Sequence, residues 1–204
     1  MVPKLMGLGR SLSRFELMIS IILIALLMGL GIRKMLLLAA YAERRFMEST
    51  VININTALHY QAGLYQLRGK WQELADMQGM NPFILVTSEP EYEDNEPMTP
   101  DEILEARSKL QVFSLPARYL GELDSPDINT LDSGYWYYDK VNKVLVYLVN
   151  NTEFFTSKLT NPARIRFRVT VGYRDNDNNE RYDPNIDDFT GIELKNLENY
   201  QWAL

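Results

Sequence analysis

The sequence predicts an α+β protein in which a long N-terminal helix, first apolar and then amphipathic, packs against a small antiparallel β-sheet. Three observations predict this fold class: an apolar run at residues 15–32, a helical stripe of apolar residues between 33 and 69, and strand-like patterns between 135 and 171. The chain has 204 residues, enough for one ordinary domain with an appendage or for two small domains.

Residues 15–32 read F-E-L-M-I-S-I-I-L-I-A-L-L-M-G-L-G-I and carry one charge, Glu16. As a helix this run is about 27 Å long, close to the ~30 Å hydrocarbon thickness of a bilayer. A buried core helix fits less well, because such helices are usually apolar on one face only. A cleaved signal peptide also fits less well, because Arg33 and Lys34 separate the run from the small residues at 40–42. We therefore expect an uncleaved transmembrane helix, whose orientation the flanking charges do not decide.

The helix is expected to continue beyond the membrane, because residues 33–69 contain no proline and Gly63 is the only glycine before Gly69. One apolar stripe recurs at steps of three and four: Met47, Val51, Ile54, Leu58, Ala62 and Tyr65. A short second helix is expected over residues 70–77. His59, the only histidine, lies beside the stripe, and a single histidine makes neither a metal site nor a catalytic triad.

Strand patterns follow in the C-terminal part. Aromatic and β-branched residues on both sides of 139–143 predict a β-hairpin over 135–149. Residues 164–171 alternate polar with apolar, so that Ile165, Phe167, Val169 and Val171 face the core against the helix stripe. A last short strand or turn is expected around 191–197, with Tyr200 and Trp202 fixing the terminus.

Charge and composition exclude several classes of function. Residues 1–45 carry a net charge of +5 and the remainder −11, so the acidic body would repel nucleic-acid phosphates and we expect no nucleic-acid partner. The absence of cysteine excludes disulfides, thiolate catalysis and zinc–thiolate sites. Residues 88–105 hold eight acids and no base, a pattern typical of a solvated surface, with a short helix expected at 100–109. No nucleophile–base–orienter set is visible, so we expect no catalytic residues and no enzyme.

One acidic loop has the spacing of a calcium site. Oxygen ligands at Asp175, Asp177, Asn179 and Asp183 match such a loop, but Glu180 stands where glycine is required and no glutamate closes the loop. Asn and Asp also favour turns for local reasons. A calcium loop and a plain hairpin loop both stay open, and no other cofactor is expected.

The motif E-L-M-I-x-I at Glu16–Ile21, followed by an apolar helix, an amphipathic helix and a small sheet, resembles the N-terminal signature of type IV pilins and type II secretion pseudopilins. The later part of the chain is similar to pilin-like accessory proteins of the mannose-sensitive haemagglutinin (MSHA) pilus system, of the MshF type. The segments that carry this similarity are A-E-R-R at 42–45, N-P at 81–82, Y-L-G-E at 119–122, G-Y-W-Y-Y-D at 134–139, L-V-Y-L-V at 145–149 and P-A-R-I-R-F-R-V at 162–169.

The chain departs from the pilin processing signature. Pilins place a glycine before the cleaved bond, an aromatic after it and the glutamate five residues into the mature chain, where this sequence has Ser11, Leu12 and Glu16. In that family the glutamate neutralises the free amine of a neighbouring subunit. Without cleavage that amine is absent, and Glu16 would lie at the headgroup level or pair with Arg14 or a partner helix.

The resemblance implies a pilin-like fold and a single-pass protein of the bacterial inner membrane. Residues 1–14 would be a cytoplasmic leader-like segment, 15–32 the transmembrane half of the helix, 33–69 its amphipathic periplasmic half, and 70–204 a periplasmic α+β domain. Its expected partners are other pilins or pseudopilins, inner-membrane assembly proteins and membrane lipid. The residues expected to pack against partner helices are Glu16, Ile19, Ile22, Ala25, Leu26, Gly29 and Gly31.

The rival hypothesis is a membrane-anchored periplasmic binding or adhesion module. Its span would be only a tether, and the aromatic strand at 135–138 or the loop at 175–183 would contact a ligand or calcium.

Overall fold

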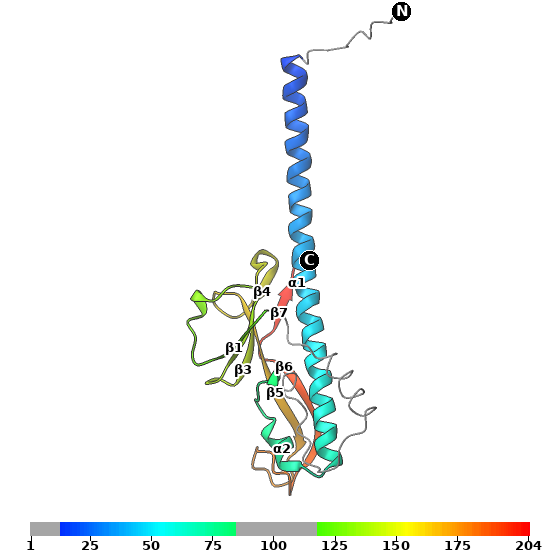
Figure 1. Cartoon of the computed structure of the whole chain (residues 1–204), viewed down its shortest axis with the longest axis vertical. Coiled ribbons are helices and arrows are strands. Elements are labelled where there is room, and N and C mark those ends of the chain that lie inside the picture. Colours follow the sequence, from blue (N-terminus) through cyan, green and yellow to red (C-terminus); the bar gives the residue numbers. More distant parts are fainter. Residues whose placement is uncertain (1–12, 85–117) are drawn as a thin grey trace, which may run out of the picture. The chain divides into compact units, whose positions relative to one another are not determined.

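The computed structural model describes residues 13–84 and 118–204, which form an α+β protein (Figure 1). The chain divides into two compact units, Met1–Ala39 and Ala40–Leu204. The described elements are α1 (Arg14–Leu67), α2 (Trp71–Asp76), β1 (Tyr119–Leu123), a 3₁₀ turn (Ile128–Thr130), β2 (Trp136–Asp139), β3 (Val144–Leu148), a second 3₁₀ turn (Thr152–Phe154), β4 (Phe155–Ser157), β5 (Arg164–Arg174), β6 (Asp188–Asn196) and β7 (Tyr200–Trp202).

Helix α1 is unbroken over 54 residues, which confirms the long helix expected from the sequence. It passes Arg33 and Lys34 without interruption. It ends in a Schellman motif: Gly69 has φ +67°, its N–H donates to the Gln66 carbonyl at 3.1 Å, and the Lys70 N–H donates to the Tyr65 carbonyl at 2.9 Å. A side chain at Gly69 would be strained at this φ, so the glycine sets the end of the helix.

The first half of α1 is apolar and exposed on all sides. Every residue from Ser13 to Ala39 is exposed. Among the described residues, α1 is the one helix that is long and apolar enough to cross a membrane. This agrees with a single membrane anchor near the N-terminus.

The main sheet has five strands in the order β1-β2-β3-β5-β6. The neighbouring strands β2 and β3, β3 and β5, and β5 and β6 are antiparallel. In the β2–β3 hairpin, Trp136 is paired with Tyr147 and Asp139 with Val144. Strand β1 pairs parallel with β2. The sheet is therefore mixed, and the expectation of a purely antiparallel sheet was wrong, because β1 returns to β2 through the long connection 124–135 rather than through a tight turn.

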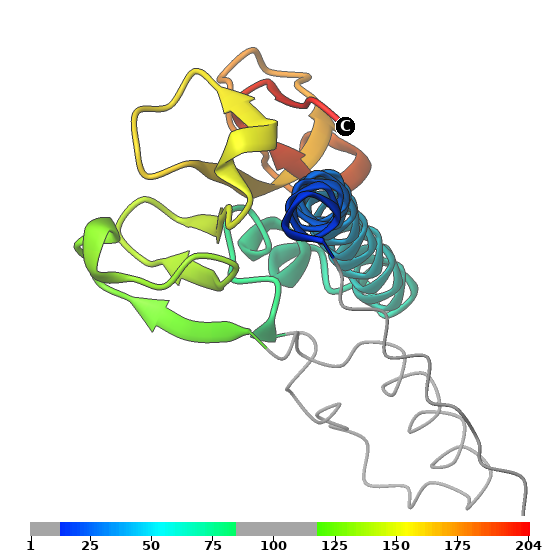
Figure 2. The same ribbon diagram turned by 90° about the horizontal axis from the view of Figure 1, so that it is seen from above.

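One face of the sheet packs on the part of α1 between Met47 and Tyr65 (Figure 2). The predicted stripe is confirmed: Met47, Ile54, Leu58 and Ala62 are buried in the core, and Val51 and Tyr65 pack against it. The sheet contributes Ile165, Phe167, Val169 and Val171, as predicted, together with Trp136, Tyr147, Ile192 and Leu194. Each such side chain contributes about 1.5–3 kcal/mol of burial free energy before chain entropy is subtracted.

Within residues 13–84 and 118–204, a second hydrophobic cluster covers the opposite face of the sheet over the hairpin. Tyr137, Val144, Val146 and Leu148 are buried there beneath Leu123, Ile128 and Leu131 of the β1–β2 connection. Strands β2 and β3 are therefore buried on both faces. This explains why the hairpin carries apolar or aromatic side chains on both sides.

The C-terminus forms more strand than the sequence predicted. Strand β6 starts at Asp188, earlier than the expected residue 191. Strand β7 pairs with β4 in a separate two-stranded sheet, where the rings of Tyr200 and Trp202 lie 5.9 Å and 5.1 Å from the ring of Phe155. The two aromatic residues fix the terminus, as expected. The predicted helix at 100–109 and the acidic run before it lie outside the described residues.

Candidate functional site

The residues expected to pack against partner helices all lie on the exposed first half of α1. Ile19, Ile22, Ala25 and Leu26 are exposed, and a Cβ added at Gly29 or Gly31 would meet nothing within 4 Å. Open space at both glycines is compatible with the close approach of another helix. The possible processing residues, Ser11 and Leu12, lie outside the described residues.

Glu16 has a local role that the sequence analysis missed. Its Oε2 accepts a hydrogen bond from the backbone N–H of Ser13 at 2.9 Å, while its own N–H donates to the Ser13 Oγ at 3.2 Å. This reciprocal pair is a capping box, which satisfies free N–H groups at the start of α1. The signal was available, because Ser13-Arg14-Phe15-Glu16 has the S-x-x-E spacing of that motif.

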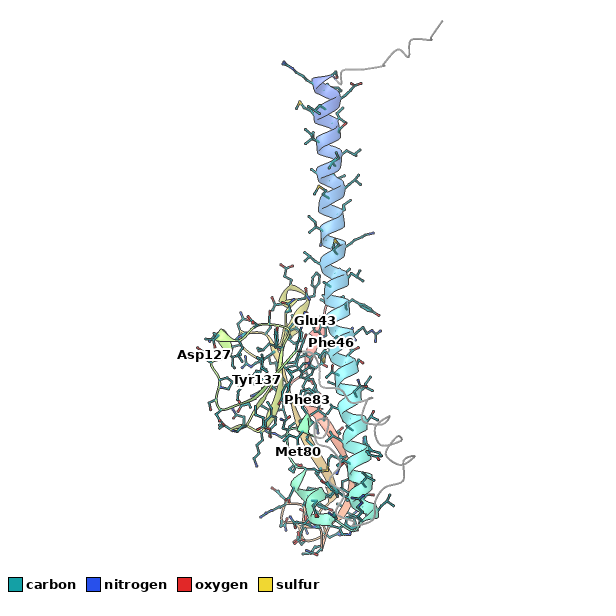
Figure 3. All side chains as sticks on the ribbon, in the orientation of Figure 1. Glu43, Phe46, Met80, Phe83, Asp127 and Tyr137 are labelled. Atoms are coloured by element: carbon teal, nitrogen blue, oxygen red, sulfur yellow. The ribbon has the colours of Figure 1, made fainter. Side chains whose placement is uncertain are left out.

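Glu43 fastens α1 to the sheet and was not among the predicted residues. It lies on α1 beside the sheet (Figure 3), where its carboxylate accepts four hydrogen bonds. The donors are the Tyr147 hydroxyl at 2.9 Å, the Asn150 N–H at 2.6 Å, the Asn151 N–H at 2.8 Å and the Asn151 Nδ2 at 2.6 Å. Hydrogen bonds to a charged acceptor are the stronger kind, so Glu43 is a principal polar contact between helix and sheet.

A second polar contact joins α1 to strand β6. The Leu194 N–H donates to the Asn55 Oδ1 at 2.7 Å, and the Asn55 Nδ2 donates to the Val51 carbonyl at 3.1 Å. Strand β6 is at the edge of the sheet formed by the described strands, so none of these strands pairs with its outward N–H groups. Helix α1 thus supplies a hydrogen-bond acceptor for one N–H group of that edge.

Burial of the Tyr147 hydroxyl, reinforced by the Glu43 charge and its hydrogen bond, raises the pKa of Tyr147 above its ordinary value of 10.0. Burial is also the main cause that raises the pKa of four further tyrosines: Tyr119, Tyr137, Tyr138 and Tyr200. These tyrosines are neutral in the folded protein at pH values where the unfolded chain has already ionised them.

We therefore expect alkaline pH to destabilise the fold. A raised folded-state pKa gives stability that is fully present below pH 10 and is lost above it, by about 1.4 kcal/mol per pH unit for each tyrosine that ionises only on unfolding. Urea unfolding of the full chain in detergent micelles between pH 8 and 11 measures this slope. Tyr147→Phe should make the slope shallower, whereas Tyr60→Phe, at an exposed position of α1, should leave it unchanged; equal slopes for both variants would contradict the account.

The acidic loop brings together a different set of carboxylates from the one the sequence predicted. Asp175, Asp177 and Asp187 each place an oxygen within 4.8 Å of the others. Asn179 instead donates its backbone N–H and its Nδ2 to this group, and Asp183 Oδ1 accepts from Asn185. Asp187 was missed because it follows the loop, immediately before β6.

Loop N–H groups already bind these carboxylates. The Glu180 N–H donates to the Asp175 carboxylate at 2.8 Å, which lowers the pKa of Asp175. Desolvation and the side-chain hydrogen bond with Asp175 raise the pKa of Asp177. The N–H groups of Asn176 and Asp183 donate to Asp187, each at 2.8 Å. Hydrogen bonding within the loop accounts for the arrangement, and calcium binding stays a prediction.

The aromatic strand proposed as a ligand surface is part of the core. Trp136, Tyr137 and Tyr138 of β2 are 0%, 1% and 6% exposed. Tyr138 is further fixed by donating its hydroxyl to the Gly79 carbonyl. These three side chains are not accessible to a ligand, whereas Tyr135, the first residue of the segment 135–138, is half-buried, so a ligand contact there stays a prediction. His59, by contrast, is exposed on α1, as a solvated role requires.

No protein-family model, curated protein or solved structure matches this chain. The resemblance to pilins and pseudopilins stays a prediction from the sequence motifs.

Proposed function

We propose that this protein is a pilin-like accessory subunit of the bacterial inner membrane, which assists the assembly of an MSHA-type type IV pilus or a type II secretion pseudopilus. The first half of α1 would cross the membrane and pack beside the helices of other pilins or pseudopilins. The globular unit would lie in the periplasm. The proposed role is assembly rather than catalysis.

One observation carries this proposal: a single unbroken helix is apolar and exposed in its first half and is the core element of a small α+β domain in its second half. A simple tether needs no such continuity, because a flexible linker between anchor and domain would suffice. A pilin-like subunit, in contrast, uses one helix both for contacts in the membrane and for its globular core.

Glu16 is the residue that we expect to contact a partner subunit in the membrane. Its capping box provides an alternative explanation for the glutamate, and the two explanations make different demands on the side chain. Capping requires an acceptor at residue 16, which glutamine supplies, and a hydroxyl at Ser13. Pairing with a basic group of a neighbour requires the negative charge.

Three variants separate these roles. Glu16→Gln keeps the cap but removes the charge, Ser13→Ala removes half of the cap but keeps the charge, and Glu16→Ala removes both. We expect Glu16→Gln and Glu16→Ala to reduce co-purification of other pilins and the number of assembled pili at least tenfold. Ser13→Ala should retain most of the co-purification and most of the assembled pili. Normal assembly with Glu16→Gln and impaired assembly with Ser13→Ala would show that the glutamate is only a cap.

A further inference from the structure

The apolar surface of α1 continues beyond the predicted span. Residues 35–38, which follow the basic pair Arg33 and Lys34, are Met35, Leu36, Leu37 and Leu38, with exposures of 72%, 44%, 41% and 66%. The first buried residue of the chain's described part is Ala40. Four consecutive helical residues point in all directions around the axis. A partner helix would cover one side of this turn, whereas a lipid layer covers every side.

The length of the helix matches this interpretation. The 20 residues from Phe15 to Lys34 extend about 30 Å, the thickness of the hydrocarbon layer. The 28 residues from Arg14 to Tyr41 extend about 42 Å, the thickness of a bilayer with its headgroups. Residues 35–41 therefore fall at the depth of one headgroup layer. Tyr41 is an aromatic residue at the outer limit of that layer, a position where tyrosine is enriched.

The basic pair supplies charge that fits lipid phosphate. Neither Arg33 nor Lys34 makes an ion pair with any residue in 13–84 or 118–204. Further along the helix, Arg44 and Arg45 are both paired with Glu48, at 2.7 Å and 3.3 Å. The charge of the first pair is thus available to an anionic partner, while that of the second pair is partly neutralised.

We propose that residues 33–41, which we call the collar, lie in the headgroup layer and bind anionic phospholipid. Met35–Leu38 insert between the lipids, and the long side chains of Arg33 and Lys34 reach their phosphate groups. This inference rests on the membrane anchor of the proposed function.

Depth measurements test the collar directly, because the chain has no cysteine and single cysteines can be introduced without background. The full chain is reconstituted at a high lipid-to-protein ratio in vesicles of phosphatidylcholine and phosphatidylglycerol. A nitroxide is attached in turn to Ile22→Cys, Met35→Cys, Leu38→Cys and Ile52→Cys, the last being 64% exposed on the globular unit. Its collisions with oxygen, which prefers lipid, and with a nickel chelate, which prefers water, are then compared.

We expect the label at 22 to favour oxygen, the label at 52 to favour nickel, and the labels at 35 and 38 to give intermediate ratios. Labels at 35 and 38 that behave like the label at 52, while 22 favours oxygen, would overturn the collar and leave the membrane anchor intact. A label at 22 that favours nickel would overturn the anchor and the collar together.

A charge variant tests the phosphate contact. The association of spin-labelled phosphatidylglycerol with the full chain is compared with that of spin-labelled phosphatidylcholine. We expect a preference of about fivefold for each free basic side chain, the equivalent of about 1 kcal/mol. Arg33→Gln/Lys34→Gln should remove the part of the preference that these two side chains contribute, and the control Arg44→Gln/Arg45→Gln should retain it. Equal preferences in the two double variants would contradict the assignment to the collar.

Discussion

Replacing Glu43 with alanine is expected to lower the free energy of unfolding of the globular unit by about 2–4 kcal/mol. The substitution removes the acceptor of four hydrogen bonds. One of the donors that lose this partner is the hydroxyl of Tyr147, a residue that is 2% exposed. A buried donor without an acceptor costs more than an ordinary hydrogen bond contributes, because its lost hydration is not replaced. Urea unfolding of the full chain in micelles, followed by tryptophan fluorescence, measures the loss.

Glu48 provides the matched control on the same helix. Among the described residues, its carboxylate forms ion pairs with Arg44 and Arg45, and such surface pairs are typically worth about 0–1 kcal/mol. Glu48→Ala should therefore change the free energy of unfolding by at most about 1 kcal/mol. Glu43→Gln should lose most of what Glu43→Ala loses, since an amide offers one acceptor oxygen and turns an N–H₂ group toward the donors. Similar values for Glu43→Ala and Glu48→Ala would contradict the role of Glu43 as the fastening between helix and sheet.

The elements that the sequence predicted well are those in which a periodic pattern repeats many times. The stripe through Met47, Ile54 and Leu58 repeats over five turns, and the alternation in β5 repeats over several residue pairs, so both predictions were confirmed. Strands β1 and β4 have five and three residues, too few for a period to show. Gly121, with φ +93°, further interrupts β1. The parallel pairing of β1 depends on the path of the chain between strands, which local pattern does not encode.

The candidate site was predictable only where its residues are close in sequence. The capping box of Ser13 and Glu16 has a recognisable spacing. Glu43, in contrast, stands in the charged segment A-E-R-R and resembles an ordinary surface residue. Its partners, Asn150 and Asn151, are more than a hundred residues away, and their N–H groups face the helix only because β3 ends there. Such contacts are properties of the tertiary fold.

The central claim is that the membrane half of α1 is a packing surface and not a tether. The most direct test replaces residues 15–32 with an unrelated transmembrane helix of equal length and counts assembled pili and co-purified pilins in cells that contain equal amounts of the protein. We predict that the exchanged protein stays in the membrane, keeps its folded globular unit and loses at least nine-tenths of both assembly measures. Undiminished assembly with the foreign helix would contradict the claim and favour a membrane-anchored binding module.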